Sequence, residues 1–159
     1  QRTLSFIAKN LEGALPAPGR GDPADAELLA TVGDAIDAFR GNFASLHLGQ
    51  ALEAWMRGVF ACNQYIDVQA PWALRKTDPE RMHAVLGTLV RAIRDLAIAI
   101  EPVVPASATA LLGQLGQAGK GHDAIGDHGW YAAARDAGFR IAPPAPIFPR
   151  LTIAETEPA

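Results

Sequence analysis

LGQALEAWMRGVFACNQYIDVQAPW, residues 48–72, carries the clearest periodicity in the sequence. Its apolar side chains recur in steps of four and three, as they do on one face of an α-helix. They are Leu48, Leu52, Trp55, Val59, Cys62 and Ile66. Pro71 lacks the N–H that a continuing helix needs, so we expect the helix to end before it. The stretch therefore predicts a long amphipathic helix that buries one face.

Further stretches repeat this pattern and are expected to be helices, namely residues 4–11, 22–39, 78–100 and 105–115. Two of them start with an Asp–Pro pair, at Asp22 and at Asp78. Such a pair supplies a capping oxygen, followed by the one helical position that tolerates proline. Gly41 is expected to end the second helix. A shorter helical piece is expected at residues 131–137.

The remaining segments interrupt the helical pattern. Residues 116–129 are rich in glycine and polar side chains, which predicts a loop. Four prolines between Phe139 and Arg150 exclude a helix there and predict an extended segment on the surface. No strand pattern or internal repeat stands out. We therefore predict an all-α protein, with residues 1–159 forming one antiparallel bundle of about five helices and an extended proline-rich C-terminal segment.

Composition limits the functions that are possible. The chain has 159 residues, 49% of them hydrophobic, which is enough for one compact domain. With 19% charged residues and a net charge of -3, it is neither a disordered tail nor a uniformly basic coat for nucleic acid. A polyanion would therefore have to bind a local basic patch. No apolar run is long enough to span a bilayer, so we expect a soluble, cytoplasmic protein without membrane contact. The sequence begins at Gln1 inside a helical pattern, and we expect it to be a fragment.

The residues that could carry catalysis or bind metal form no recognised motif. The histidines have no ligand spacing that would predict a metal site; they are His47, His83, His122 and His128. Gly119 and Lys120 resemble part of a phosphate-binding loop, but the required first glycine, the Ser or Thr and the preceding strand are missing. Cys62 is the only cysteine and lies on the apolar stripe, where we expect an unreactive thiol with a raised pKa. We therefore expect no catalytic residue, no metal and no cofactor in this chain.

One segment favours nucleic acid. Trp72 directly follows Pro71, which restricts where the indole points, and Arg75 and Lys76 follow closely. A flat aromatic ring beside two cations is what stacking on a base next to phosphates requires. A tryptophan after a helix end is also commonly a plug between helices, and composition by itself favours that alternative.

The first predicted helix offers a second basic face. Arg2, Phe6 and Lys9 lie away from its apolar stripe. These cations would serve an RNA backbone, or would simply be solvated around a phenylalanine that packs on a neighbouring element.

Several segments, taken in order, give the chain a specific resemblance to a known family. They are the opening helix Arg2 to Asn10, Leu52 to Trp55, the cluster Asn63, Tyr65, Ile66 and Asp67, the run Ala70, Pro71 and Trp72, then Lys76, Asp78, the helix with Arg94, residues 101–105, and Phe148 to Leu151. Each is weak alone, but their order and spacing resemble the C-terminal anticodon-binding domain of methionyl-tRNA synthetases, class I aminoacyl-tRNA synthetases.

This resemblance implies recognition of the CAU anticodon of methionine tRNAs, with Trp72 stacking on the first anticodon base. It also implies that Arg2 reads the anticodon together with an asparagine four positions earlier, ahead of Gln1. Phe6, Lys9, Arg75 and Lys76 are the further candidates for anticodon contacts. We assign Asn63, Tyr65 and Pro71 to positioning the helix end, with Asn63 flanking the buried side of the helix and Tyr65 roughly opposite that side.

The resemblance further implies partners outside this sequence. The family's catalytic domain uses ATP to join methionine to tRNA, and we expect the proline-rich segment to return toward that domain. Two other functions remain open from the residues themselves. A protein-interaction bundle would bury Trp72, and a small enzyme would need a polar pocket with shifted titrating groups.

Overall fold

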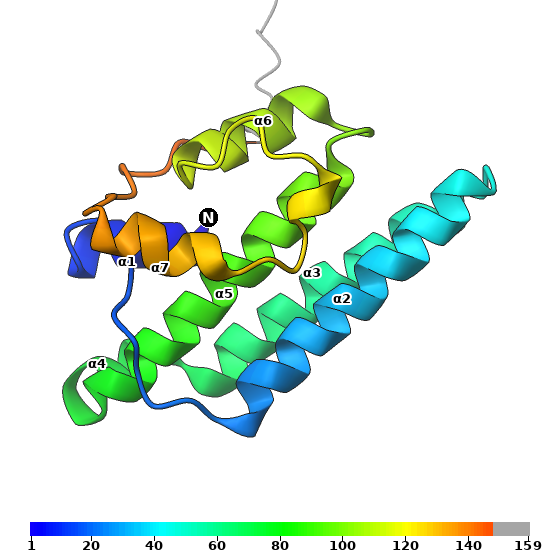
Figure 1. Cartoon of the computed structure of the whole chain (residues 1–159). Coiled ribbons are helices and arrows are strands. Elements are labelled where there is room, and N and C mark those ends of the chain that lie inside the picture. Colours follow the sequence, from blue (N-terminus) through cyan, green and yellow to red (C-terminus); the bar gives the residue numbers. More distant parts are fainter. Residues whose placement is uncertain (148–159) are drawn as a thin grey trace, which may run out of the picture.

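The protein is described by a computed structural model that covers residues 1–147 and consists of helices and connecting loops (Figure 1). The α-helices are α1 (Arg2–Asn10), α2 (Pro23–Ala44), α3 (Leu48–Gln69), α4 (Pro71–Thr77), α5 (Pro79–Ile100), α6 (Pro105–Gln114) and α7 (Gly129–Asp136). A single 3-10 turn occupies His122–Ala124. Within residues 1–147 the only β-type pairing is an isolated antiparallel bridge between Ala14 and Arg140. The predicted all-α class is confirmed.

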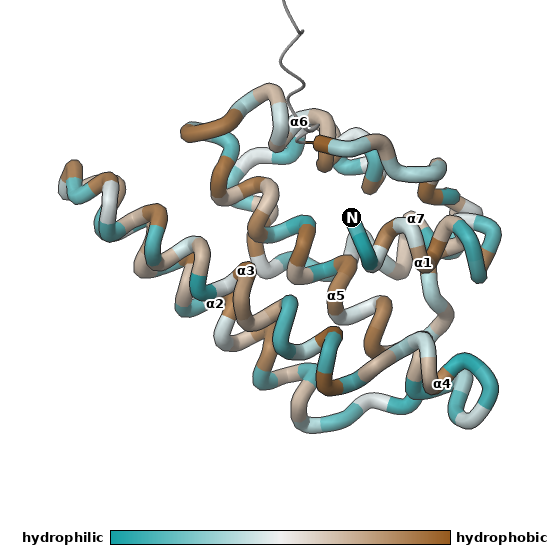
Figure 2. Tube along the Cα trace, turned by 180° about the vertical axis from the view of Figure 1, so that it is seen from behind, coloured by the Kyte–Doolittle hydropathy of each residue, from teal (hydrophilic) through white to brown (hydrophobic). Residues whose placement is uncertain are grey.

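Three long helices form the main core. α2 and α3 make an antiparallel hairpin that packs against α5, and α1, α6 and α7 lie on the other side of α5 (Figure 1). Hydrophobic and hydrophilic positions alternate along these helices (Figure 2), as the sequence periodicity predicted. α5 is buried over most of its length because it contacts neighbours on both sides. A second, smaller core joins α1 to α5 through Leu4, Ile7, Met82 and Leu86.

Both predicted Asp–Pro starts are confirmed by their hydrogen bonds. The Asp22 side chain accepts from the Ala24 N–H at 2.9 Å, and the Asp78 side chain accepts from the Arg81 N–H at 3.1 Å. Each satisfies an N–H that the first helical turn leaves without a partner. These caps fix where α2 and α5 begin.

One expected helix end is wrong, and another is confirmed with an addition. α2 does not stop at Gly41 but continues to Ala44, with Ser45 as its C-cap, because Gly41 does not adopt the left-handed backbone with which a glycine commonly ends a helix. α3 ends at Gln69, before Pro71, as expected, but a further helix that was not expected follows it directly. Ala70 takes the left-handed conformation, with φ of 41°, and Pro71 opens the short helix α4. A proline in the first turn is compatible with a helix because its missing N–H has no partner there.

The glycine-rich loop is fastened to the middle of α5. The fully buried Arg94 donates to the carbonyl oxygens of Ala124 and Asp127, at 2.8 and 3.1 Å. The neighbouring Asp95 accepts from the Gly126 N–H at 3.1 Å and lies 2.9 Å from His128 Nε2. Residues 116–129 therefore follow a defined path despite their composition.

The C-terminal segment is extended as far as it is described. Ile141 N–H donates to the Gly13 carbonyl at 2.7 Å, and Gln114 reaches the Ala145 carbonyl at 3.2 Å. The segment thus runs past α1 toward α6. The expected continuation through Phe148, Pro149, Arg150 and Leu151 lies outside the described residues.

Candidate nucleic-acid interface

The junction of α3 and α4 presents Trp72 at the surface. Pro71 is buried and anchors the start of α4, while the next side chain, Trp72, is 46% exposed. The left-handed backbone at Ala70 turns the chain sharply, and a non-glycine residue adopts it at a cost of about 1 kcal/mol. This turn holds the indole off the bundle. The core-plug alternative for Trp72 is therefore wrong.

α1 faces this junction across an open pocket of about 320 Å³. Its walls come from α1, from the end of α3 and from the start of α4, and consist of Arg2, Ser5, Phe6, Lys9, Asn10, Ile66, Pro71 and Trp72. The predicted basic face of α1 and the predicted tryptophan thus belong to one surface. Phe6 packs against the second core, as one of the two alternatives expected, and it also lines this pocket.

Arg2 is held over the indole. Its guanidinium carbon lies 5.2 Å from the centre of the Trp72 ring, within cation–π range. Arg2 Nη2 also donates to Asp67 Oδ1 at 2.8 Å, which ties α1 to α3. At the other end of α1, Arg75 Nη1 donates to Asn10 Oδ1 at 2.5 Å and ties α1 to α4. The pocket is therefore framed by two side-chain links across its edges.

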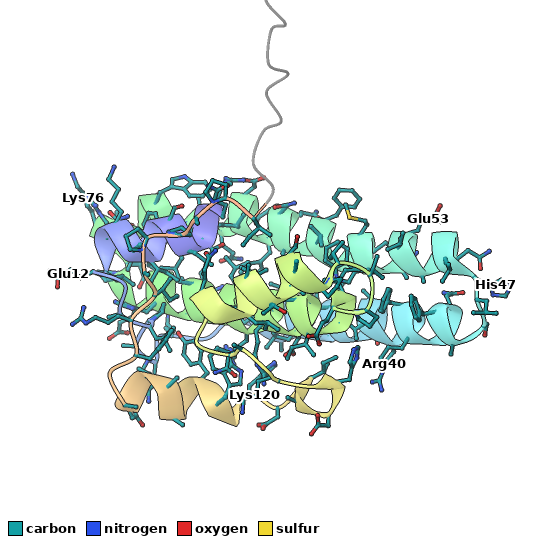
Figure 3. The ribbon with its side chains drawn as sticks, turned by 90° about the horizontal axis from the view of Figure 1, so that it is seen from above. Glu12, Arg40, His47, Glu53, Lys76 and Lys120 are labelled. Atoms are coloured by element: carbon teal, nitrogen blue, oxygen red, sulfur yellow. The ribbon has the colours of Figure 1, made fainter. Side chains whose placement is uncertain are left out.

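The remaining candidate cations lie at the same end of the molecule. Lys9 lines the pocket, and Arg75 and Lys76 occupy the last turn of α4. Figure 3 shows Lys76 at the end of the bundle opposite to His47 and Glu53. In a protein with a net charge of -3, Arg2 and Lys9 thus line the Trp72 pocket, and Arg75 and Lys76 follow Trp72 on the same short helix.

A buried polar network that joins α2, α3 and α5 fixes the end of α3. Tyr65 is 7% exposed, and its hydroxyl is hydrogen-bonded to Asp25 of α2. Arg81 of α5 donates to both carboxylate oxygens of Asp25, at 2.6 and 2.7 Å, and to Gln69 Oε1 at 2.9 Å. Burial alone would raise the pKa of Asp25, but the hydrogen bonds from Arg81 and Tyr65 outweigh it and hold that pKa below its usual value. Burial, followed by the Asp25 hydrogen bond, raises the pKa of the Tyr65 hydroxyl, which stays protonated.

The structure corrects the expected orientation of Tyr65. It lies on the buried side of α3 and not opposite to it, because a step of three residues from Cys62 returns to nearly the same face. Asn63 is exposed and does not line the Trp72 pocket. It borders a second, mainly apolar cavity of about 530 Å³ between α1, α3, α5 and α6. Asn10, Asp67 and Arg81 were not among the predicted site residues, since their contacts depend on the fold.

The structure also bears on the other candidates for chemistry. Burial raises the pKa of the Cys62 thiol to about 12, as expected for a thiol on the apolar stripe. Among residues 1–147 no three His, Cys, Asp or Glu side chains gather as a metal site would require. No helix in that part of the chain is long and apolar enough to cross a membrane.

Comparisons with known proteins identify the kind of domain. Residues 15–158 match a family model described as the anticodon binding domain of methionyl tRNA ligase. The chain belongs to this family.

Curated relatives carry the same name. Methionine--tRNA ligase of Mycobacterium tuberculosis is 38% identical over 156 residues, which cover 94% of this chain and 29% of the relative. Methionine--tRNA ligase of Mesorhizobium japonicum is 37% identical over 150 residues, again covering 94% of this chain and 29% of the relative. The chain therefore spans less than a third of the length of these relatives.

Solved structures agree. The crystal structure of free Mycobacterium tuberculosis methionyl-tRNA synthetase matches with a TM-score of 0.79 and 36% identity, covering 96% of this chain and 31% of that one. The structure of the same enzyme bound by methionyl-adenylate matches with a TM-score of 0.77 and 36% identity, covering 94% and 30%.

Proposed function

We propose that this chain binds the CAU anticodon loop of methionine tRNAs as one domain of a methionine--tRNA ligase. The observation that carries the proposal is the exposed Trp72, held rigidly at the α3–α4 junction opposite the basic face of α1. Unstacked bases of an anticodon loop present flat faces, and a protruding indole is a platform for one of them. In keeping with the family resemblance, we assign the first anticodon base to Trp72.

The side chains around the pocket have different roles in binding the anticodon loop. The guanidinium of Arg2 lies over one face of the indole, so a base that stacks on this face has to displace it, and the displaced donors can then reach the edge of the base. Lys9, Arg75 and Lys76 border the platform and are placed to neutralise phosphates of the loop. Tyr65 and Pro71 serve as positioning residues, since both are buried where α3 ends and α4 begins. Asn63 is a weaker candidate for this role because it borders the other cavity.

The complete ligase would combine this domain with a catalytic one. A solved relative is bound by methionyl-adenylate, and ATP and methionine are accordingly substrates that we assign to the part of the ligase that this chain does not match. The domain's partners are then methionine tRNA and the protein's own catalytic domain, and its place of work is the cytoplasm. Its contribution to the reaction is to select the tRNA and to orient it.

A protein-interaction bundle is the second candidate. It is favoured by apolar side chains that are exposed outside the pocket, such as Leu46 at 81% and Phe60 at 60%. Under that alternative, replacing Trp72 would leave RNA affinity unchanged.

Affinity measurements with a matched pair of variants separate the two functions. The dissociation constant is measured for a CAU tRNA and for one with a changed first anticodon base. Trp72→Ala should weaken CAU binding about 5-fold to 150-fold, because stacking of one base contributes about 1–3 kcal/mol. Phe60→Ala removes an even more exposed aromatic ring from outside the pocket and should change nothing. Equal binding of both tRNAs by the unaltered protein would refute the proposed function.

A further inference from the structure

Two arginines border the Trp72 pocket, and their partners differ in charge. Arg2 is paired with the carboxylate of Asp67, at 2.8 Å, whereas Arg75 is bound to the neutral amide of Asn10, at 2.5 Å. Both arginine side chains reach solvent. The arrangement thus contains one guanidinium whose partner carries the opposite charge and one whose partner is neutral.

The amide of Asn10 is itself fixed. Its Nδ2 donates to the Phe6 carbonyl at 2.9 Å, four residues earlier on α1, so that its Oδ1 is left to face α4. This leaves Arg75 with one tethered N–H, while its guanidinium has five donors in all. A neutral acceptor therefore orients Arg75 at the pocket edge without reducing its charge.

Charge decides which arginine attracts a phosphate. A cation that neutralises a phosphate of a single strand releases a bound counterion, which makes the affinity depend on salt. For each phosphate neutralised, the logarithm of the affinity falls by about 0.7 for each tenfold rise in salt concentration. Arg2 contributes little to such a term, since Asp67 already compensates its charge, and a phosphate there would also approach a carboxylate. Arg75 has no acidic partner among the described residues that would offset its charge.

On the basis of the proposed function, we propose that Arg75 is the phosphate-binding arginine of the pocket and that Asn10 is its positioning residue. Arg2 contacts the stacked base under this assignment and binds no phosphate. The neutral side chain at position 10 is a functional requirement under this assignment, because a carboxylate there would still bind Arg75, though without the bond to the Phe6 carbonyl, and would cancel its charge.

Salt dependence of tRNA affinity tests this assignment, with the protein at its full natural length and a CAU tRNA transcript as the probe. Arg75→Gln should reduce the slope of log affinity against log salt by about 0.7. Asn10→Asp should reduce it by a similar amount although the guanidinium remains. Asn10→Ala should weaken binding by about threefold to tenfold with the slope preserved, since it removes the tether and not the charge. Arg2→Gln should preserve the slope and lower the preference for CAU.

The outcomes distinguish this inference from the proposed function. If the unaltered protein prefers CAU but Arg75→Gln leaves the slope unchanged, or Asn10→Asp behaves as Asn10→Ala does, the assignment is wrong while the function stands. An equal loss of slope in Arg2→Gln and Arg75→Gln would also overturn it. A protein without preference for CAU would contradict both. The positions are exposed or partly exposed, and thermal melting of each variant confirms that it folds.

Discussion

Replacing Asp25 by Asn should destabilise the chain more than a surface change does. The variant keeps the shape of the side chain but removes the charge that Arg81 needs, and Arg81 is only 7% exposed. Breaking a buried pair in this way costs about 3–5 kcal/mol. Because Arg81 keeps its bonds to Gln69 and to the Arg20 carbonyl, we expect the lower end, about 3 kcal/mol. For a chain of this size that corresponds to a fall in Tm of about 6–12 °C.

Denaturant unfolding provides the assay and its controls. The transition midpoint should fall with an unchanged m-value. Asp34→Asn, an exposed change on the same helix, should stay within about 0.5 kcal/mol of the unaltered chain. The double variant Asp25→Leu with Arg81→Met should be less destabilised than Asp25→Asn, because no charge is left buried without a partner. A cost of Asp25→Asn below about 1 kcal/mol would refute the account of this network.

Three further expectations follow from single residues. The folded pKa of Asp25 is lowered below its unfolded value near 3.8, so the contribution of this carboxylate to stability is complete above that pH and is lost as pH falls through the folded pKa. In unfolding measured at decreasing pH, the unaltered chain should therefore lose stability more steeply below about pH 4 than the Asp25→Asn variant does. Gly19→Ala should lower stability in thermal melts, since its Cβ would lie 1.9 Å from the Glu80 carbonyl oxygen, whereas Gly33→Ala in α2 should be neutral or stabilising by up to about 1 kcal/mol. The Cys62 thiol should react with an alkylating reagent at pH 8 about a thousandfold more slowly than an exposed thiol, and rapid labelling of the folded chain would contradict its burial.

Local chemistry explains why the long helices could be predicted. The Asp–Pro starts of α2 and α5 and the stripe of α3 involve residues within a few positions of one another, and the sequence displays such patterns directly. α4 was missed because seven residues are too few for a periodic signal, and because Pro71 was interpreted as an end. The same proline is in fact the first residue of a helix.

The site could be predicted only in part, for a related reason. Trp72 and the basic face of α1 were found because an aromatic ring between cations is visible in the sequence. The links that assemble them are distant in the chain, since Asn10 and Arg75 are 65 positions apart. Periodicity does not say which face of α1 meets which turn of α4. Tyr65 was misplaced for another reason, since its step of three residues from Cys62 already puts it near the apolar stripe; only the partners of its hydroxyl, Asp25 and Arg81, come from other helices.

The most direct measurement of the central claim is the environment of the first anticodon base in the complex. A base stacked on an indole lies in its ring current, so the proton resonances of that base should move upfield when a CAU anticodon stem-loop binds. We expect this shift with the unaltered protein and with Phe60→Ala, and its loss with Trp72→Ala. An upfield shift that persists in Trp72→Ala, or its absence in the unaltered complex, would contradict the claim that Trp72 is the stacking platform.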